Sequence, residues 1–167
     1  QIDQPVSQAD GGPFGPGASP AIYRNRVFLV SDEHPNVWWL AAFDTQTGKP
    51  LWRIQEAKER GFGWSTPFVW KHDGRTELIV IGKSYAVSYA PETGKELWRI
   101  GGLTGQSTPT PVAADGLLYL ATGSQGASNR PVFAVRPGAS GDITLANHEG
   151  GGLRAAGVVR WRVGRPL

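Results

Sequence analysis

The sequence predicts an all-β protein built from repeated units of short antiparallel strands. One segment, TGKPLWRI at residues 47–54, returns as TGKELWRI at residues 93–100 with a single change. A second marker, Ser-Pro or Ser-Thr-Pro, begins at Ser19, Ser65 and Ser107. Apolar runs of about 4 to 8 residues alternate with turn residues, which is typical of strands and not of helices.

Each unit carries enough alternating sequence for four strands. In the second unit these are TPFVW, TELIVI, SYAVSY and ELWRI, separated by the turn sequences KHDGR, GK and PETGK. Four antiparallel strands that recur every roughly 40 to 50 residues are typical of a β-propeller blade. We therefore predict a partial β-propeller of about three four-stranded blades, an open arc of a larger ring. The blades fall at 18–63, 64–105 and 106–167, the last with a glycine-rich insertion, after a Pro/Gly-rich loop at 1–17, all in one propeller fragment.

The repeated segment has a mechanical interpretation as a turn followed by an outer strand. Asp44 ends the third strand of its unit, where its carboxylate can accept amide hydrogens of the turn, and Gly48 supplies the positive φ that reverses the chain. Pro50 is tolerated at the start of an edge strand because no ladder hydrogen bond is lost there. Trp52 and Trp98, large rings with one N–H each, are predicted to lie between adjacent blades.

Composition excludes several kinds of site. The chain has no cysteine, which excludes disulfides, thiolate catalysis and Cys-ligated zinc. No run approaches the ~18 consecutive apolar residues of a membrane helix. The net charge of +3 permits contact with nucleic acid without arguing for it. Basic residues gather only beside Trp161, and we interpret them as the outer face of a terminal strand, with no nucleic-acid partner: Arg154, Arg160, Arg162 and Arg165.

Residues 42–52 resemble the tryptophan-docking motif of the quinoprotein-like (PQQ-like) β-propeller family, Ala-x-Asp-x-x-Thr-Gly-x-x-x-Trp. The first copy matches at every defined position: Ala42, Asp44, Thr47, Gly48 and Trp52.

Two further copies are less complete. The second keeps Thr93, Gly94 and Trp98 but has Ser88 and Ala90 where Ala and Asp are expected. In the third, Ala134 fits, Arg136 replaces Asp, and Trp161 is the candidate for a displaced docking Trp beyond the insertion. The resemblance spans roughly residues 18 to 163 and implies the propeller fold.

The resemblance also implies two kinds of activity. Family members include alcohol and sugar dehydrogenases that hold pyrroloquinoline quinone and calcium in the central channel, often with a vicinal disulfide that a Cys-free chain cannot make. They also include non-enzymes, such as the propeller lipoprotein of the bacterial outer-membrane assembly machine. A calcium site needs several oxygen ligands, yet the first-strand segments SPAIY, STPFVW and STPTPV carry no carboxylate.

We therefore expect a non-catalytic, extracytoplasmic (periplasmic or secreted) binding or scaffold module that holds a protein or polymer partner and needs no cofactor. Two alternatives stay open. The chain is part of a pyrroloquinoline-quinone-dependent alcohol or sugar dehydrogenase with quinone and calcium, or it supplies purely structural blades of a larger enzyme.

The segments that begin each blade are the candidate ligand contacts, because the first strand of a propeller blade lines the channel and the loop before it reaches a channel mouth. The plainer interpretation is that these hydroxyls satisfy backbone groups at strand starts. We predict His34, His72 and His148 to be solvent-exposed loop residues. The candidate contacts are Trp64, Ser65, Thr66, Gln106, Ser107 and Thr108.

Three blades are too few for a ring, because propellers close with about four to eight. An open arc leaves an apolar face at each end, large enough to drive association. The expected partners are therefore the remaining blades of a longer protein or further copies of this chain. The start at Gln1 instead of Met favours a removed leader or a piece of a longer protein.

Overall fold

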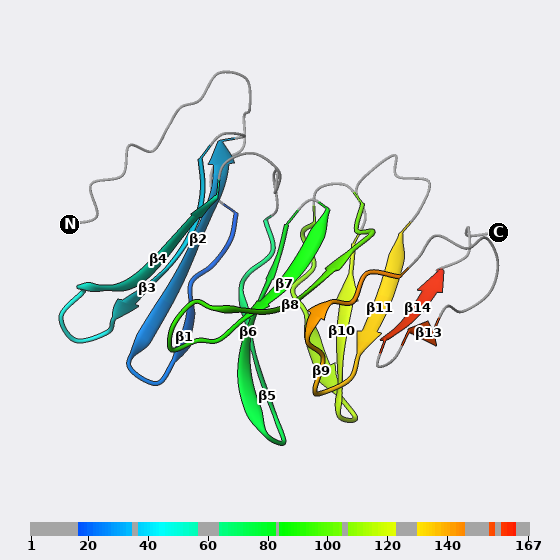
Figure 1. Ribbon diagram of the computed structural model, residues 1–167. Coiled ribbons are helices and arrows are strands. Elements are labelled where there is room, and N and C mark those ends of the chain that lie inside the picture. The colour runs from blue at the N-terminus through cyan, green and yellow to red at the C-terminus, as the bar shows by residue number, and fades with distance from the viewer. Residues whose placement is uncertain are drawn as a thin grey trace.

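The computed structural model describes residues 17–34, 37–56, 64–82, 84–104, 107–122, 130–145, 154–155 and 158–162. These residues form strands, turns and loops and no helix. Three sheets stand side by side in chain order (Figure 1). The predicted all-β fold, a partial propeller of three blades, is confirmed.

The first blade is an antiparallel sheet of four strands in chain order. It consists of β1 (Ala21–Tyr23), β2 (Arg26–His34), β3 (Val37–Asp44) and β4 (Pro50–Glu56). The tight turn between β1 and β2 places Arg24 at φ 54°.

The second blade repeats this plan with β5 (Phe68–His72), β6 (Arg75–Ile81), β7 (Tyr85–Tyr89) and β8 (Glu96–Gly101). A fifth strand, β12 (Gly141–Asp142), pairs with β8 in the parallel direction. Residues 141–142 lie in the range predicted for the third blade, and their pairing partner is in the second sheet. The five residues between β11 and β12, 136–140, bring the chain back to β8.

The third blade contains β9 (Val112–Ala114), β10 (Leu117–Ala121) and β11 (Pro131–Val135), closed by β14 (Val158–Arg162). A short strand, β13 (Arg154–Ala155), pairs with the outer side of β14. The predicted fourth-strand sequence VVRWR thus lies where a fourth strand belongs.

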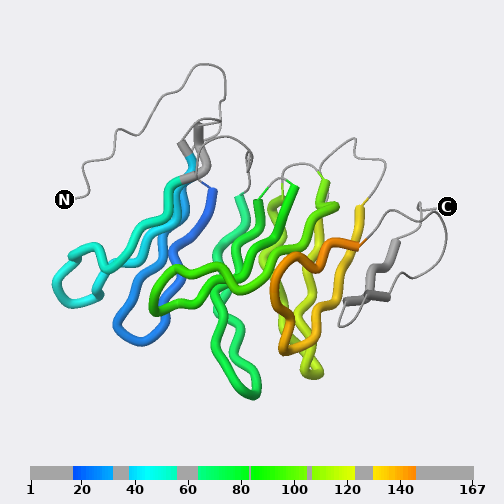
Figure 2. The backbone as a smooth tube through the Cα atoms, viewed as in Figure 1, coloured from blue at the N-terminus to red at the C-terminus, as the bar shows by residue number. Residues whose placement is uncertain are grey.

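Two apolar cores lie between the blades. One joins the first blade to the second and includes Phe28, Leu40, Leu78 and Tyr89. The other joins the second to the third and includes Trp70, Trp98, Ile100, Leu118 and Phe133. Each blade uses alternate residues of its strands for alternate neighbours, so both faces of the second blade are covered. The backbone trace shows the second blade between the other two (Figure 2).

The first two blades share the same β-bulge between their third and fourth strands. In the first blade the β3–β4 register shifts between Ala42 and Phe43, and in the second the β7–β8 register shifts between Ser88 and Tyr89. Each shift accommodates one extra residue next to the turn, which is the geometry of a β-bulge. The described residues include no helix with the length and apolarity that a membrane span requires.

Candidate functional site

The turn before β4 has the geometry that its sequence predicts. Asp44 Oδ1 accepts hydrogen bonds from the Gln46 amide (3.1 Å), the Thr47 amide (2.8 Å) and the Thr47 hydroxyl (2.9 Å). Bonding to Thr47, above all, lowers the pKa of the Asp44 carboxyl. Gly48 has φ 68°, and its amide donates to the Asp44 carbonyl (2.9 Å).

The second turn keeps this backbone without the carboxylate. Gly94 has φ 71° and donates its amide to the Ala90 carbonyl at 2.9 Å. Thr93 Oγ1 accepts from the Lys95 amide at 3.3 Å. The Thr-Gly pair is therefore sufficient for the turn, and the Asp is an addition to it.

Trp52 joins the first blade to this second turn. Its Nε1 donates to the Pro91 carbonyl at 3.0 Å, and the ring lies 5.9 Å from that of Phe28, measured between centroids. A Cβ added to Gly94 would come within 2.9 Å of Trp52 Cε3, so the indole lies directly on the glycine. Ala42, opposite Trp52 in the register, is fully buried.

Trp98 occupies the same register position, opposite Ser88, but its bond goes elsewhere. The ring is fully buried in the core between the second and third blades. Its Nε1 donates to Glu77 Oε2 at 2.6 Å, within its own blade, and not to a turn of the third blade.

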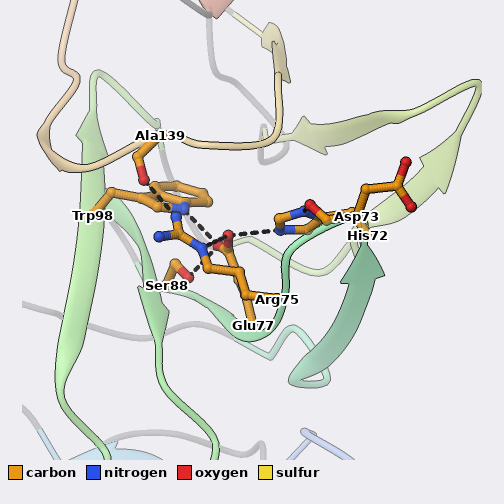
Figure 3. A network of polar contacts seen from close by, with 7 residues as sticks. All are labelled: His72, Asp73, Arg75, Glu77, Ser88, Trp98 and Ala139. Atoms are coloured by element: carbon orange, nitrogen blue, oxygen red, sulfur yellow. Dashed lines mark hydrogen bonds and ion pairs between the residues drawn. The ribbon is translucent and has the colours of Figure 1, made fainter.

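Glu77 is the centre of a buried polar network (Figure 3). Its side chain is fully buried. Oε1 accepts from His72 Nε2 (2.8 Å) and Arg75 Nε (2.6 Å). Oε2 accepts from Ser88 Oγ (2.6 Å) and Trp98 Nε1 (2.6 Å). Burial, the largest single effect, raises the pKa of the Glu77 carboxyl. The four hydrogen bonds, led by those from Ser88 and Arg75, together lower the pKa by more, so it lies below its ordinary value.

The prediction that His72 is an exposed loop residue is wrong. It is the last residue of β5, and its side chain is only 6% exposed. The imidazole packs against Trp70 with 4.3 Å between centroids, and Nδ1 lies 3.1 Å from the Asp73 carbonyl oxygen. A polar turn in the sequence concealed this burial, because Glu77, the partner that draws the ring inward, lies on the next strand. His148 and the side chain of His34 lie outside the described residues.

Arg75 extends the network to the third unit. Its guanidinium donates to the Ala139 carbonyl, at the start of the segment that leads into β12. We call residues 139–145 the strap. Within the strap, the Ile143 amide donates to the Arg99 carbonyl at 2.9 Å, and Thr144 Oγ1 accepts from the Gly101 amide at 2.8 Å. Glu77 therefore orients an arginine that holds the strap against the second blade.

The candidate channel-mouth residues lie before β5 and β9 and link neighbouring units. The Trp64 amide donates to the Ser107 carbonyl at 2.9 Å, and Ser65 Oγ donates to the Pro109 carbonyl at 2.9 Å. Thr66 Oγ1 accepts from the Ser19 amide at 3.2 Å. These bonds satisfy backbone groups, as the plainer interpretation expects, and a ligand-binding role stays a prediction. Thr108 is exposed, and Gln106 lies outside the described residues.

The third docking position is held by a different residue. In the β11–β14 register Val159 lies opposite Ala134, and Trp161 lies two residues along, opposite Val132. The structure describes the backbone of Trp161 but not its side chain, so its docking role stays a prediction. In the described part of the chain, His, Asp and Glu form no group of three or more able to hold a metal ion.

Comparison with known proteins agrees with this architecture. The family model described as outer membrane protein assembly factor BamB matches residues 38–135, more than half of the chain. The match runs from β3 of the first blade to β11 of the third, and so includes both blade junctions. A search of curated proteins gave no match. The chain belongs to the PQQ-like β-propeller repeat family represented by the outer membrane protein assembly factor BamB.

Proposed function

We propose that this chain is a non-catalytic binding or scaffold module that acts outside the cytoplasm and holds a protein partner on its blades. The observation that carries the proposal is a difference in exposure between equivalent strand positions. Residues that are packed where two blades meet have equivalents at the two open ends of the arc, and the side chains of these equivalents are exposed.

The first open end is on the first blade. Val69 of β5 packs into the core against the first blade. Ile22 takes the equivalent place in β1, after the Ser-Pro marker, and is 69% exposed. Its cross-strand neighbour is Val27, so the face is apolar at this position.

The second open end is on the third blade. Trp70 of β5 packs into the core against the third blade. Val112 takes its place in β9 and is 59% exposed, opposite Tyr119. Because Trp70, its equivalent, makes a blade contact, we take Val112 to mark the position where a protein partner would pack.

A buried hydroxyl at the same end supports this interpretation. Ser65 donates to a carbonyl of the following unit. Ser107, its counterpart, is fully buried, and within the described residues its Oγ has no hydrogen-bond partner. A buried hydroxyl without a partner costs about 1 to 3 kcal/mol. A protein backbone docked against the third blade would supply the acceptor.

The state of Glu77 favours a scaffold over an enzyme. A general base needs a lone pair within reach of a substrate proton. Both oxygens of this buried carboxylate are already occupied by four donors, which is the arrangement of a structural group. The family's description supports a place outside the cytoplasm.

Sedimentation velocity at increasing concentration tests the proposal. We expect association that Ile22→Asp and Val112→Asp each weaken at least tenfold, since a buried charge opposes apolar contact by well over about 1.4 kcal/mol. Lys49→Asp, an exposed change in the turn before β4, is the control. A chain that stays monomeric, or associates equally well with Asp at both ends, contradicts the open-face interface.

A second measurement tests the non-catalytic part. The protein is incubated with pyrroloquinoline quinone and calcium and passed through a desalting column. We expect no retained quinone absorbance and no dye-coupled alcohol oxidation. Retention of both would replace the scaffold proposal with the dehydrogenase alternative.

A further inference from the structure

We propose that the outer edge of β4 is a binding site for an extended segment of a partner protein, which adds to the first blade as a parallel strand. This inference takes from the proposed function only that the partner is a protein. The site is the hydrogen-bonding edge of the first sheet. Arg53 lies on the same face of this sheet as Ile22, but on β4 at the opposite side of the sheet from β1.

The protein provides its own precedent in the second blade. β4 and β8 share the sequence Leu-Trp-Arg-Ile at 51–54 and 97–100. The outer edge of β8 carries β12, with Gly141 opposite Trp98 and Asp142 opposite Arg99. Strand addition of this kind gives affinity through backbone hydrogen bonds and specificity through alternate side chains.

Burial differs between equivalent residues of β4 and β8, and the strap residues Ile143 and Leu145 pack in the core that covers β8. Trp98 and Ile100 are fully buried in β8. Trp52 and Ile54, at the same places in β4, are only partly buried although both contact the core between the first two blades. Leu51 is 44% exposed. The first blade therefore presents a partly open apolar edge where the second has a covered one.

The backbone of β4 is set to accept a strand. Arg53 lies opposite Ala41 as Arg99 lies opposite Val87, so the two strands have the same register. The Arg99 carbonyl accepts from the strap, which places the Arg53 carbonyl at the outer edge as well. In the described part of the chain β4 pairs with β3 alone. An edge with unpaired backbone groups is a template for another strand.

The strap also indicates the chemistry of the occupant. Gly141 lies opposite Trp98 at φ 68°, a conformation that glycine adopts freely, and Asp142 lies opposite Arg99. Ile143 packs on the core, and the Thr144 hydroxyl accepts the Gly101 amide. The equivalent groups on β4 are Trp52, Arg53 and Gln55. The partner segment therefore has the order small, acidic, apolar, hydroxyl.

Arg53 is the main determinant of this preference. It is exposed, and its guanidinium lies 5.0 Å from the centre of the Trp39 ring. The ring orients the guanidinium while leaving its edge free to meet an acidic side chain, because a cation stacked on a π face keeps its in-plane donors.

Hydrogen exchange on the intact protein tests the site with a capped peptide of the strap sequence, Ala-Ser-Gly-Asp-Ile-Thr-Leu. We expect slower exchange at the outward amides of Arg53 and Gln55 and no change at Trp52 and Ile54, which face β3. A peptide with Lys in place of Asp should bind roughly fivefold more weakly, the upper range for an exposed ion pair. The Arg53→Glu variant should bind the Lys peptide as well as the unchanged protein binds the Asp peptide.

Two variants separate this site from the open faces. Gln55→Pro removes an outward amide, which an edge strand tolerates, and should abolish peptide protection with an unchanged circular dichroism spectrum. Ile22→Asp should leave peptide protection intact. Absence of protection in the folded protein at saturating peptide, or protection that survives Gln55→Pro, overturns the proposal. Edge protection that rises with protein concentration and no peptide also overturns it, because a second copy would then be the occupant.

Discussion

The junction between the first and second blades differs from that between the second and third, although the same tryptophan segment serves both. Trp52 reaches across to the next blade and bonds the Pro91 carbonyl above Gly94. Trp98 turns to Glu77 in its own blade, and Arg75 and the strap make the crossing instead. The repeated segment thus fixes the position of the indole ring. Which group accepts its Nε1–H hydrogen bond depends on what the next unit offers.

The cause of the difference is in the third unit. There the Thr-Gly turn is replaced by Pro-Gly-Ala-Ser-Gly, so Trp98 has no equivalent turn to dock on. A buried indole N–H must still find an acceptor. Glu77 supplies it, and the expanded turn supplies β12. The missing docking motif is compensated by a carboxylate and an added strand.

The largest effect is expected from Glu77→Ala. The change leaves Arg75 without a counter-charge and His72, Trp98 and Ser88 without an acceptor. Breaking a buried ion pair costs about 3 to 5 kcal/mol. Urea unfolding should show a loss of this size. Glu92→Ala, an exposed carboxylate paired at 3.8 Å with Arg24, is the control and should change stability by less than about 1 kcal/mol. Equal effects would contradict the network.

Two turn glycines test the first junction. Gly48 and Gly94 both have positive φ, so alanine at either costs about 1 to 2 kcal/mol. A Cβ at Gly48 meets open space, whereas one at Gly94 meets Trp52 at 2.9 Å. Gly94→Ala should therefore lose a further about 1 to 3 kcal/mol in thermal or urea unfolding. If both variants lose the same free energy, the docking contact is not tight.

The two docking tryptophans should respond differently to phenylalanine. Trp98→Phe removes a hydrogen bond to a buried carboxylate, which costs about 1.5 to 3 kcal/mol. Trp52→Phe removes a bond to a neutral carbonyl in a partly buried place and should cost about 1 kcal/mol. Chemical denaturation of the two variants in parallel measures the difference. A larger loss at Trp52 would reverse the comparison.

The smallest effect concerns pH. The pKa of Glu77 in the folded protein lies below its ordinary value of 4.5. The contribution of Glu77 to the free energy of unfolding is therefore present above about pH 4.5 and is lost as pH falls through the folded-state pKa. Denaturation across this range should show the free energy of unfolding falling with acid, and Glu77→Gln should reduce the slope. Asp44→Asn should reduce it less, since Asp44 is only partly buried whereas Glu77 is fully buried. An unchanged slope in Glu77→Gln would contradict the assignment.

Local sequence predicted the blades well because their determinants are local. Period-two alternation, the Thr-Gly turns and the spacing of Trp52 and Trp98 each act within a few residues. Glu77, in contrast, reads as an outward polar residue in the strand RTELIVI. Its four donors come from β5, β6, β7 and β8, and no short pattern links them. β12 was also missed, because a two-residue strand in a glycine-rich insertion has no periodicity to detect.

The strap also governs how stability is distributed along the molecule. In repeat proteins each unit contributes its own free energy and a coupling to its neighbour. Because β12 belongs to the third unit in sequence and to the second sheet in pairing, neither of these blades can melt without breaking hydrogen bonds of the other. No strand crosses between the first and second sheets as far as the chain is described. The molecule should thus unfold as two cooperative blocks, with the N-terminal block fraying first.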